Sequence, residues 1–533
     1  MSLYFKALGG ANEVGASSYL VSIDDKNILL DAGIRVNRKG TDMLPDLEEL
    51  AEKLDLVIFS HAHMDHIGAL PVLYRKHPEA FYCSTPPTKL LASILLKDSY
   101  KIMTYEEEKN NEILFTEEEI EQSLWKLETF PFSSWFEPLA GIKIYFHPSG
   151  HIMGAASILI HDIKNDIKIL YSGDISIVNQ RTVEGCSSAA GELFNNINLL
   201  IVESTYGGGF HPKRQDEETK LAMTVGGIIE KGGTVLIPAF ALGRAQEIIL
   251  ILRDYILGRK IPSFPVYVDG MVRSICDLYR DLSDYLPEKM KNYVRNSRQP
   301  VFWQEGRSSL ARIIKADKGT RTEALLRPGC IISSSGMMTG GPSVWYAKQL
   351  IDNHKNAILI TGYQDEESPG RRLLEMETGK NIKFNEEEFL LKCKVERYHL
   401  SAHADQGQLC QWISSVKPKS IILVHGDPPS IQSLRTKLSD KYIVWNPGVG
   451  ETVMPLGKPE WMTEKLNFVL KGKDIKYKAK MESLDNEIVI KIDKSIEDDP
   501  LWQQYYANYR DIEFKWHGTR LLMRGGGTMN SDQ

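Results

Sequence analysis

The stretch that decides the fold is His61-Ala62-His63-Met64-Asp65-His66. It follows an apolar run at residues 56–59, which predicts a buried strand ending at Ser60. Residues 67–74 have the apolar spacing of a helix, so the cluster lies at a strand-to-helix turn. His61 and His63 are two apart in an extended segment, so their side chains point the same way. Asp65 and His66 fall on the turn, where their side chains can converge on a second centre. Imidazole nitrogens and a carboxylate oxygen are ligands suited to zinc or a similar divalent metal. A polar loop with chance histidines is disfavoured, because the cluster is dense and follows an apolar strand.

Composition indicates a globular protein of several domains. The chain has 533 residues, which is too many for one ordinary core. Its contents of 42% hydrophobic and 25% charged residues are typical of soluble proteins. The net charge of -6 gives no global attraction to nucleic acid, so any such binding requires a local patch.

The sequence shows neither a targeting signal nor a cysteine spacing typical of disulfides or zinc sites. The first residues lack a signal peptide, and no long uncharged apolar stretch predicts a membrane span. The six cysteines form no C-x-x-C pair, which indicates reduced thiols in a cytoplasmic protein.

Two later strands end in a potential metal ligand beside a glycine. The strand at residues 144–147 leads to Gly150-His151, and the strand at residues 167–172 ends in Gly173-Asp174. Glycine lets the backbone approach closely at such a turn. We expect His151 to give a third imidazole to the first metal, and Asp174 to bridge two metals. His147 lacks the adjacent glycine and is interpreted as structural.

The middle of the chain has a different pattern. Apolar strands near residues 234–238, 265–270, 329–335 and 357–364 alternate with helices, which predicts a parallel α/β domain. After it, His403 and His425 again follow apolar or small residues. The simplest topology is one domain interrupted by another, to which the chain returns near residue 390 to supply its last ligands.

An ordered set of motifs resembles one family. The HxHxDH stretch resembles the metallo-β-lactamase superfamily, and so does Leu-Leu-Asp-Ala-Gly at residues 29–33, whose aspartate usually supports the metal loop. Glu203 in Glu-Ser-Thr-Tyr-Gly, His403 in Ser-Ala-His-Ala-Asp and His425 in Val-His-Gly-Asp resemble motifs A, B and C of the β-CASP nucleases. The stretches at residues 238–247 and 335–342 resemble the prokaryotic relatives of the pre-mRNA 3′-end processing endonuclease subunit. The resemblance covers about the first 455 residues.

This resemblance implies an α/β fold, namely a metallo-β-lactamase αββα sandwich with an inserted α/β β-CASP domain and a small C-terminal appendage. We expect the sandwich at residues 1–208 and 389–456, the insert at 209–388 and the appendage at 457–533. The appendage has an alternating strand pattern at 487–492 and the aromatic residues Trp502, Tyr505, Tyr506, Tyr509, Phe514 and Trp516. Two interpretations stay open for it: a β-rich unit that packs on the body or on a dimer mate, and a module that docks a protein partner or nucleic acid.

The expected site holds two Zn²⁺ ions. One is bound by His61, His63, His151 and Asp174, and the other by Asp65, His66, Asp174 and His425. Asp65 is expected to orient the attacking hydroxide, and His403 to protonate the leaving oxygen while Glu203 holds its tautomer. The alternatives are a core histidine for His403 and an ion pair with the insert for Glu203.

Substrate contacts are expected in the cleft between the domains. Arg244 and the Ser335-Gly336 loop precede helices, whose first backbone N–H groups suit phosphates. Tyr206 and Tyr363 are candidates for base stacking, with core packing as the alternative. In the family that the chain resembles, a histidine in motif C accompanies RNA cleavage and a valine DNA repair, so His425 favours RNA.

The leading hypothesis is a zinc-dependent ribonuclease of single-stranded RNA that is endonucleolytic, with an additional 5′-exonucleolytic mode left open. The second is a DNA nuclease of repair or defence with the same metal mechanism. A thioester or lactone hydrolase is disfavoured by the insert and motifs A to C. An inactive scaffold is disfavoured because every ligand position is filled. A homodimer and a protein partner bound through residues 457–533 remain open.

Overall fold

The computed structural model describes residues 2–50, 53–107, 112–187, 192–297, 300–304, 306, 309–384 and 387–457, and beyond these six strands between 467 and 528. The chain forms two compact units, Met1–Val453 and Met454–Gln533. Among the described residues, no helix is long and apolar enough to cross a membrane. All six cysteines are free thiols, five of them buried.

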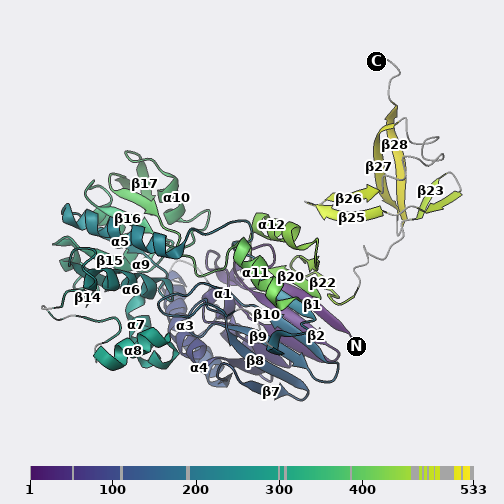
Figure 1. The fold of residues 1–533 in the computed structure, drawn as a ribbon, viewed down its shortest axis with the longest axis horizontal. Helices are drawn as coiled ribbons and strands as arrows, with labels where there is room; N and C mark the ends of the chain where they lie inside the picture. Colours follow the sequence, from purple (N-terminus) through teal and green to yellow (C-terminus); the bar gives the residue numbers. More distant parts are fainter. Residues whose placement is uncertain are drawn as a thin grey trace. The chain divides into compact units, whose positions relative to one another are not determined.

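The first unit contains two seven-stranded sheets that face each other (Figure 1). One has the order β22 (Thr452–Val453), β1 (Leu3–Gly9), β2 (Ser18–Ile23), β3 (Lys26–Leu30), β4 (Leu56–Ile58), β5 (Phe81–Ser84) and β6 (Leu127–Thr129). The other has the order β21 (Ile443–Trp445), β20 (Ser420–Val424), β11 (Leu199–Glu203), β10 (Ile167–Tyr171), β9 (Ala156–Asp162), β8 (Ile142–Pro148) and β7 (Trp135–Leu139). Tyr19 of β2 and Tyr171 of β10 are buried with ring centroids 5.7 Å apart, so inward-facing side chains of both sheets share one core.

Helices cover the outer faces of this sandwich. Apolar side chains of the first sheet share a buried cluster with helices on that face: α2 (Leu70–Lys76), α3 (Pro86–Glu107) and α4 (Glu117–Lys126). On the other sheet, Leu200 and Leu423 share a cluster with α11 (Gln406–Val416) and α12 (Pro428–Leu438). The four layers are therefore the predicted αββα sandwich.

The inserted domain is a six-stranded parallel sheet. Its order is β14 (Arg312–Lys315), β13 (Pro265–Asp269), β15 (Cys330–Ser333), β12 (Val235–Pro238), β16 (Ala357–Ile360) and β19 (Lys394–Arg397). Its helices are α5 (Arg214–Glu230), α6 (Arg244–Leu257), α7 (Val272–Asp281), α8 (Glu288–Ser297), α9 (Gly341–Leu350) and α10 (Pro369–Glu375), with the hairpin β17 (Asn381–Phe384) and β18 (Glu387–Leu390). β19 pairs in parallel with β16, although it lies after the boundary predicted at residue 388.

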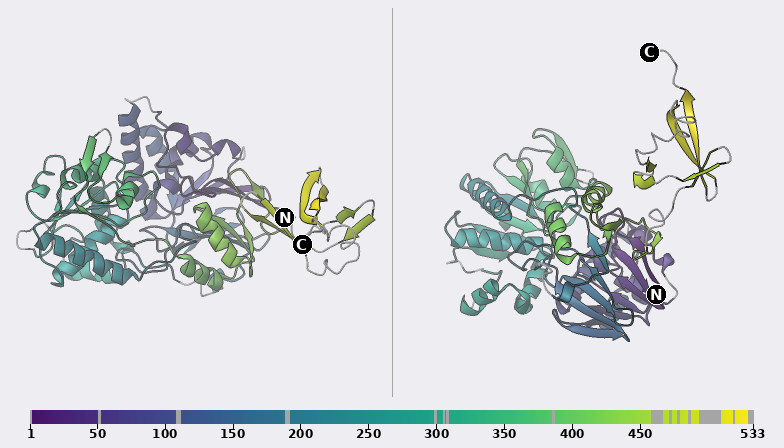
Figure 2. Two further views of the ribbon diagram at one scale, coloured as in Figure 1. Left: turned by 90° about the horizontal axis from the view of Figure 1, so that it is seen from above. Right: turned by 45° about the vertical axis from the view of Figure 1, so that its right-hand side comes forward.

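The chain then returns to the sandwich. β20 pairs in parallel with β11 over five residue pairs, and β22 pairs with β1. In Figures 1 and 2 the green α11 and α12 accordingly lie beside the purple and blue strands of the sandwich. The inserted domain (teal) lies at the other end of this unit. The predicted interruption of one domain by another is confirmed.

The second unit contains three antiparallel hairpins among its described residues. They are β23 (Asn467–Leu470) with β24 (Lys473–Lys476), β25 (Ala479–Leu484) with β26 (Glu487–Ile492), and β27 (Tyr509–His517) with β28 (Arg520–Thr528). The strand predicted at residues 487–492 coincides with β26. Of the aromatic cluster, Trp502, Tyr505 and Tyr506 lie outside the described residues.

Candidate metal centre

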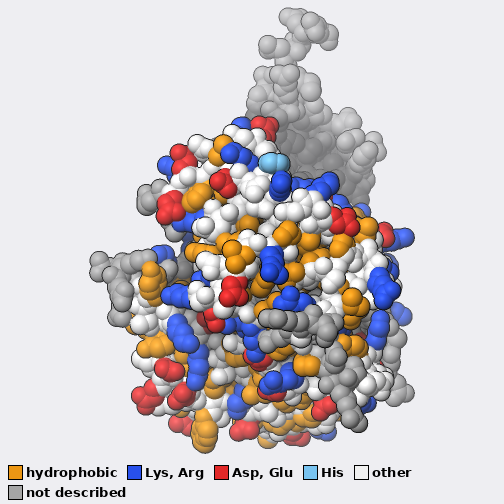
Figure 3. Space-filling model, turned by 90° about the vertical axis from the view of Figure 1, so that its left-hand side faces the viewer, with side chains coloured by type: hydrophobic (Ala, Val, Ile, Leu, Met, Phe, Trp, Pro, Cys, Tyr) orange, Lys and Arg blue, Asp and Glu red, His pale blue; other side chains and the backbone are white. Residues whose placement is uncertain are grey.

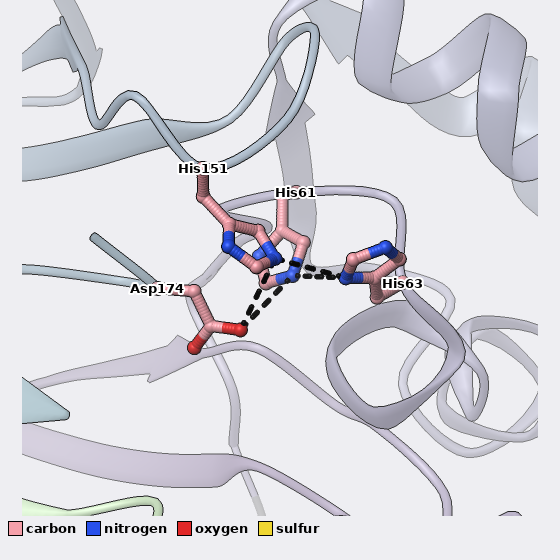
Figure 4. Close-up of side chains that lie close together, drawn as sticks. All are labelled: His61, His63, His151 and Asp174. Atoms are coloured by element: carbon pink, nitrogen blue, oxygen red, sulfur yellow. Dashed lines mark hydrogen bonds and ion pairs between the residues drawn. The ribbon is translucent and has the colours of Figure 1, made fainter. Parts of the chain in front are cut away.

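Four predicted ligands meet where β4, the 150–154 loop and β10 end (Figure 4). His63 Nδ1 lies 3.2 Å from His61 Nε2 and 3.1 Å from His151 Nε2. Asp174 Oδ2 lies 3.5 Å from each of the latter two nitrogens. Ligand atoms at zinc-bond distances of about 2.0–2.2 Å in a tetrahedron are about 3.3–3.6 Å apart. The spacing of these atoms therefore fits one tetrahedral metal ion.

Hydrogen bonds fix which nitrogen of each ring faces this point. His151 Nδ1 lies 2.9 Å from the carbonyl oxygen of Ala402, and His63 Nε2 lies 3.5 Å from that of Leu242. A carbonyl oxygen only accepts, so these outer nitrogens donate and the inner ones carry lone pairs. Burial, joined by nearby imidazoles, lowers the pKa of His61 and His151 well below the ordinary value, which favours the neutral, metal-binding form.

The second group contains Asp65, His66 and His425. His66 Nε2 lies 3.3 Å from Asp174 Oδ1, and His425 Nε2 lies 3.8 Å from both Asp174 Oδ1 and Asp65 Oδ2. Asp65 lies in the short helix α1 (Met64–Ile67), not on the predicted turn, and a quarter of its side chain is exposed, so this group has an open side.

Asp174 joins the two groups. Its Oδ2 faces the first group and its Oδ1 the second, and Oδ1 is buried without a hydrogen-bond partner among the described residues. Burial alone raises the pKa of Asp174, but the charges of His66, His425 and His403 outweigh burial and hold this pKa well below its usual range. A buried, ionised oxygen that lacks a donor is what a bridging metal ligand requires.

Outside these ligands, Asp31 collects hydrogen bonds from both groups. His66 Nδ1 donates to Asp31 Oδ2 at 2.8 Å, and Tyr171 and Ser60 donate to the same oxygen at 2.7 Å. His61 Nδ1 lies 3.0 Å from Ser60 Oγ, so Asp31 also orients His61 through that hydroxyl. Ser17 Oγ lies 2.8 Å from His425 Nδ1 and fixes the last ring.

His403 and Glu203 form a third, adjacent pair. His403 Nδ1 lies 2.9 and 3.1 Å from the two Glu203 oxygens, while its Nε2 lies 3.9 Å from Asp174 Oδ2. Glu203 is buried and also accepts from the backbone N–H of Ile175 at 2.9 Å. Burial alone lowers the pKa of His403, but the charges of Glu203 and Asp174 raise it to about 9. This shift favours a protonated imidazole, and 19% of the His403 side chain is exposed.

Arg244 begins α6 and is buried, with 9% of its surface exposed. Its Nε and Nη1 have no hydrogen-bond partner in the part of the chain that is described. Burial, joined by the nearby charge of Arg214, lowers the pKa of Arg244 to about 10. The Tyr206 ring lies 6.1 Å from the ring of His403, which places this tyrosine beside the site.

The structure does not link Ser335 and Gly336 to the ligand groups by any contact among the described residues. Ser335 Oγ accepts from the backbone N–H of Thr339 at 3.1 Å, within its own loop. A Cβ on Gly336 would lie 2.7 Å from the backbone nitrogen of Phe240, so the glycine permits close packing on the turn before α6. Both residues thus border the 239–243 turn, which reaches His63 through Leu242.

Several supporting residues were missed by the sequence reasoning. Ser17 and Gln180 bond to candidate ligands that are remote in sequence, and Ser60 bonds to the adjacent His61. Glu247 touches no ligand but binds Thr182, close to Gln180. Only the position of Ser60, directly before the metal stretch, offered a signal. His147, interpreted as structural, contacts Ser187 and Phe194 and belongs to none of the ligand groups.

Comparisons with known proteins agree with this architecture. A metallo-beta-lactamase superfamily domain matches residues 20–201, a Beta-Casp domain residues 245–373, and a Zn-dependent metallo-hydrolase RNA specificity domain residues 390–447. RNase aCSPSF2 of Saccharolobus solfataricus is 33% identical over 437 residues, which is 81% of either chain. The chain belongs to the β-CASP family of metal-dependent nucleases. 

Other relatives of this β-CASP nuclease span most of it. The probable RNase MJ4 of Methanocaldococcus jannaschii is 33% identical over 459 residues, 85% of this chain and 100% of that protein. Transcription termination factor FttA of Methanothermobacter thermautotrophicus is 30% identical over 465 residues, 84% of this chain and 70% of that protein. A crystal structure of an Enterococcus faecalis protein of unknown function shares the fold, with a TM-score of 0.50, 15% identity and coverage of 85% of this chain and all of that one.

Proposed function

We propose that this β-CASP nuclease hydrolyses phosphodiester bonds of RNA with two zinc ions. The first ion is assigned to His61, His63, His151 and Asp174, and the second to Asp65, His66, Asp174 and His425. The observation that carries this proposal is Asp174, whose two oxygens face different ligand groups while Oδ1 has no donor among the described residues.

When bound, two such ions would lower the pKa of a water molecule toward neutrality and neutralise charge on the phosphate. Asp65, on the open side of the second group, accepts the hydrogen bond that aims the attacking oxygen at phosphorus. His403 donates its proton from Nε2 to the leaving oxygen, and Glu203 holds Nδ1–H and keeps the imidazole protonated until then.

The substrate side of the proposal rests on charge. Arg244 presents a buried guanidinium with unpartnered donors, which suits a phosphate of the backbone. Tyr206 is assigned to contact the same RNA strand. Ser335 and Gly336 are assigned to contact that RNA strand farther along the inserted domain. On the face of the insert in Figure 3, Lys and Arg are intermingled with Asp and Glu, so a local group such as Arg244 has to supply attraction.

RNA is preferred over DNA on two grounds. Two relatives are named RNases, and the domain matched at residues 390–447 is described as an RNA specificity domain and contains both His403 and His425. Both endonucleolytic and 5′-exonucleolytic cleavage are proposed. Dimerisation and a partner of the C-terminal unit stay predictions.

The test compares matched single strands of RNA and DNA, each labelled internally and each carrying a 5′-phosphate or a 5′-hydroxyl. Preferential cleavage of RNA is expected. Internal products identify the endonucleolytic mode, and a requirement for the 5′-phosphate identifies the exonucleolytic one. Preferential cleavage of DNA would contradict the choice of substrate.

Metal analysis tests the cofactor. Purified protein reconstituted with zinc is expected to hold two ions per chain. Asp174→Asn removes the shared charge but keeps the size, so it is expected to weaken both sites. One tightly held ion in the wild type, unchanged in Asp174→Asn, would contradict the bridged pair.

A further inference from the structure

Glu247 is a buried carboxylate of the insert that binds the sandwich. It lies on α6, one turn after Arg244, with 1% of its surface exposed. Its Oε1 accepts from the backbone N–H of Thr182 at 2.7 Å and from the hydroxyl of Thr182 at 2.6 Å. Its Oε2 accepts from the backbone N–H of Arg181 and from Arg214 Nη2, each at 2.9 Å.

The loop that Glu247 holds leads directly to a metal ligand. Gln180 precedes the two residues whose N–H groups bind Glu247. Its Nε2 donates to the backbone carbonyls of Gly150 and His151 at 2.9 and 2.8 Å. The backbone of His151 therefore depends on the position of residues 180–182, and that position on Glu247.

A second series of hydrogen bonds, a second arm of the network around Glu247, leads to His403, the proposed proton donor. Arg214, which shares Oε2 of Glu247, donates from Nη1 to the carbonyl oxygen of Ser401 at 3.2 Å. Ser401 Oγ accepts from the backbone N–H of His403 at 3.0 Å. The same carboxylate is thus two hydrogen-bonded residues away from His403.

We infer that Glu247 is a positioning residue: from the inserted domain, its carboxylate holds the loops of His151 and His403 in their relative places. This inference rests on the proposed roles of His151 as a metal ligand and His403 as the proton donor. It adds that the insert completes the geometry of the centre, besides contacting substrate.

A carboxylate is required at this position because four donors converge on two oxygens. A glutamine of the same size offers one oxygen, and its NH₂ group must face either the Thr182 donors or those of Arg181 and Arg214. Glu247→Gln therefore loses about two of the four bonds without changing volume. Loss of such outer partners typically costs about 10–100-fold in metal affinity or activity.

The experiment uses the full chain loaded with Co²⁺, whose visible absorption reports ligand geometry, together with RNA cleavage by the zinc form. For Glu247→Gln we expect a changed Co²⁺ spectrum and kcat lower by about 10–100-fold. KM is expected to stay within about threefold, because the substrate contacts are kept. A wild-type Co²⁺ spectrum together with a wild-type kcat would overturn the inference.

Milder variants separate the two arms. Gln180→Met removes the side-chain donor to the carbonyls of Gly150 and His151 and leaves the bonds of Glu247 in place, so the Co²⁺ spectrum should change. Arg214→Lys replaces the two nitrogens that span Glu247 and Ser401 by a single nitrogen, so kcat should fall while the Co²⁺ spectrum stays that of the wild type. These two results support the inference even if Glu247→Gln does not fold, whereas wild-type behaviour of both variants would overturn it.

The matched control is Asp254→Asn. Asp254 lies on the same helix and pairs with the side chain of Arg181, but a third of its side chain is exposed and it does not touch Glu247. Its variant should match the wild type in both measurements, and an effect as large as that of Glu247→Gln would overturn the inference. If the wild type cleaves no RNA, the proposed function fails, while the Co²⁺ spectra still decide the arm to His151.

Discussion

His403 and His61 are the same residue type with opposite electrostatics. Burial and neighbouring imidazoles hold the pKa of His61 well below the ordinary value, whereas Glu203 and Asp174 raise that of His403 to about 9 despite its burial. The first environment favours a neutral imidazole, and the second a protonated one. The partner of Nδ1 is a serine hydroxyl for His61 and a carboxylate for His403.

His403→Ala tests this division. We expect kcat to fall by about 10²–10⁴-fold, because general acid catalysis is lost, with metal content unchanged. His147→Ala is the control, since His147 lies outside every ligand group. Steady-state cleavage and metal analysis are the measurements. A parallel loss of metal would show that His403 is a ligand instead.

Arg244→Met tests the buried charge at the start of α6. Loss of a charge-assisted bond to phosphate should raise KM for RNA by roughly 10–100-fold and flatten its dependence on salt. The same change should raise the Tm of the free protein, because an unpartnered buried charge is removed. Arg280→Met, at an exposed arginine paired with Asp281, should change neither. An unaltered KM would remove Arg244 from the substrate site.

At the scale of elements, the turn after β3 is packed directly on the metal stretch. A Cβ on Gly33 would lie 1.8 Å from the carbonyl oxygen of Asp65, and the neighbouring N–H of Ala32 donates to His66 O at 2.9 Å. The two loops therefore cannot separate or approach without moving two ligands of the second group.

Gly33→Ala should therefore weaken binding of the second metal and lower the free energy of unfolding by about 1–3 kcal/mol through overpacking. Gly227→Ala in α5 is the matched control. No atom lies within 4 Å of its Cβ, so it should stabilise the protein by about 0.5–1 kcal/mol. Denaturant unfolding and metal titration measure both effects. Unchanged metal affinity in Gly33→Ala would refute the coupling between these loops.

Glu396 joins β19 to α5 through an ion pair with Lys220 at 3.0 Å, and it also pairs with Lys394. Burial alone raises its pKa, but hydrogen bonds from Lys394, Lys220 and Tyr398 lower it from 4.5 to about 2. The pKa of Glu396 is lower in the folded than in the unfolded state, so its ion pairs stabilise the fold at pH values above the unfolded pKa. This stabilisation is lost as the pH falls from the unfolded pKa toward the folded pKa of about 2.

Glu396→Gln should accordingly reduce the acid sensitivity of the metal-free protein. The drop in Tm between about pH 6 and about pH 3 should be smaller in this variant than in the wild type. Glu377→Gln, which alters an exposed pair with Lys380, should keep the wild-type drop. An equal drop in all three proteins would show that Glu396 contributes nothing to the acid response.

Sequence reasoning reached the candidate ligands because each follows a strand end, where an apolar run makes a polar residue conspicuous. Asp174 after β10 and His425 after β20 are of this kind. It did not reach Gln180 or Glu247, whose importance comes from partners that the fold brings together from remote segments. It also placed a boundary before β19, because that strand, Lys-Val-Glu-Arg, carries three charged residues among four, and only its pairing with β16 shows where it belongs.

For the whole molecule, we expect metal to stabilise the first unit. Five buried or half-buried histidines and two carboxylates converge there, and the unfolded chain does not hold them together for a cation. A metal concentration of about 100 times Kd adds about 2.7 kcal/mol to the free energy of unfolding. Removing zinc with a chelator should therefore lower Tm and abolish cleavage, and adding zinc should restore both. The Tm of Asp174→Asn should respond less; an equal response would argue against a shared ligand.

The pairing of β20 with β11 has a consequence for synthesis on the ribosome. Until residues 420–424 emerge, β11 is the edge of its sheet, with five buried residues and an unpaired row of backbone groups. More than 200 residues of chain separate the two strands, and the whole inserted domain is made in between. A nascent or truncated chain that lacks β20 therefore carries an adhesive edge and cannot yet cut nucleic acid. Cells that produce this protein need to shield that edge during translation, and a truncation before residue 420 should aggregate.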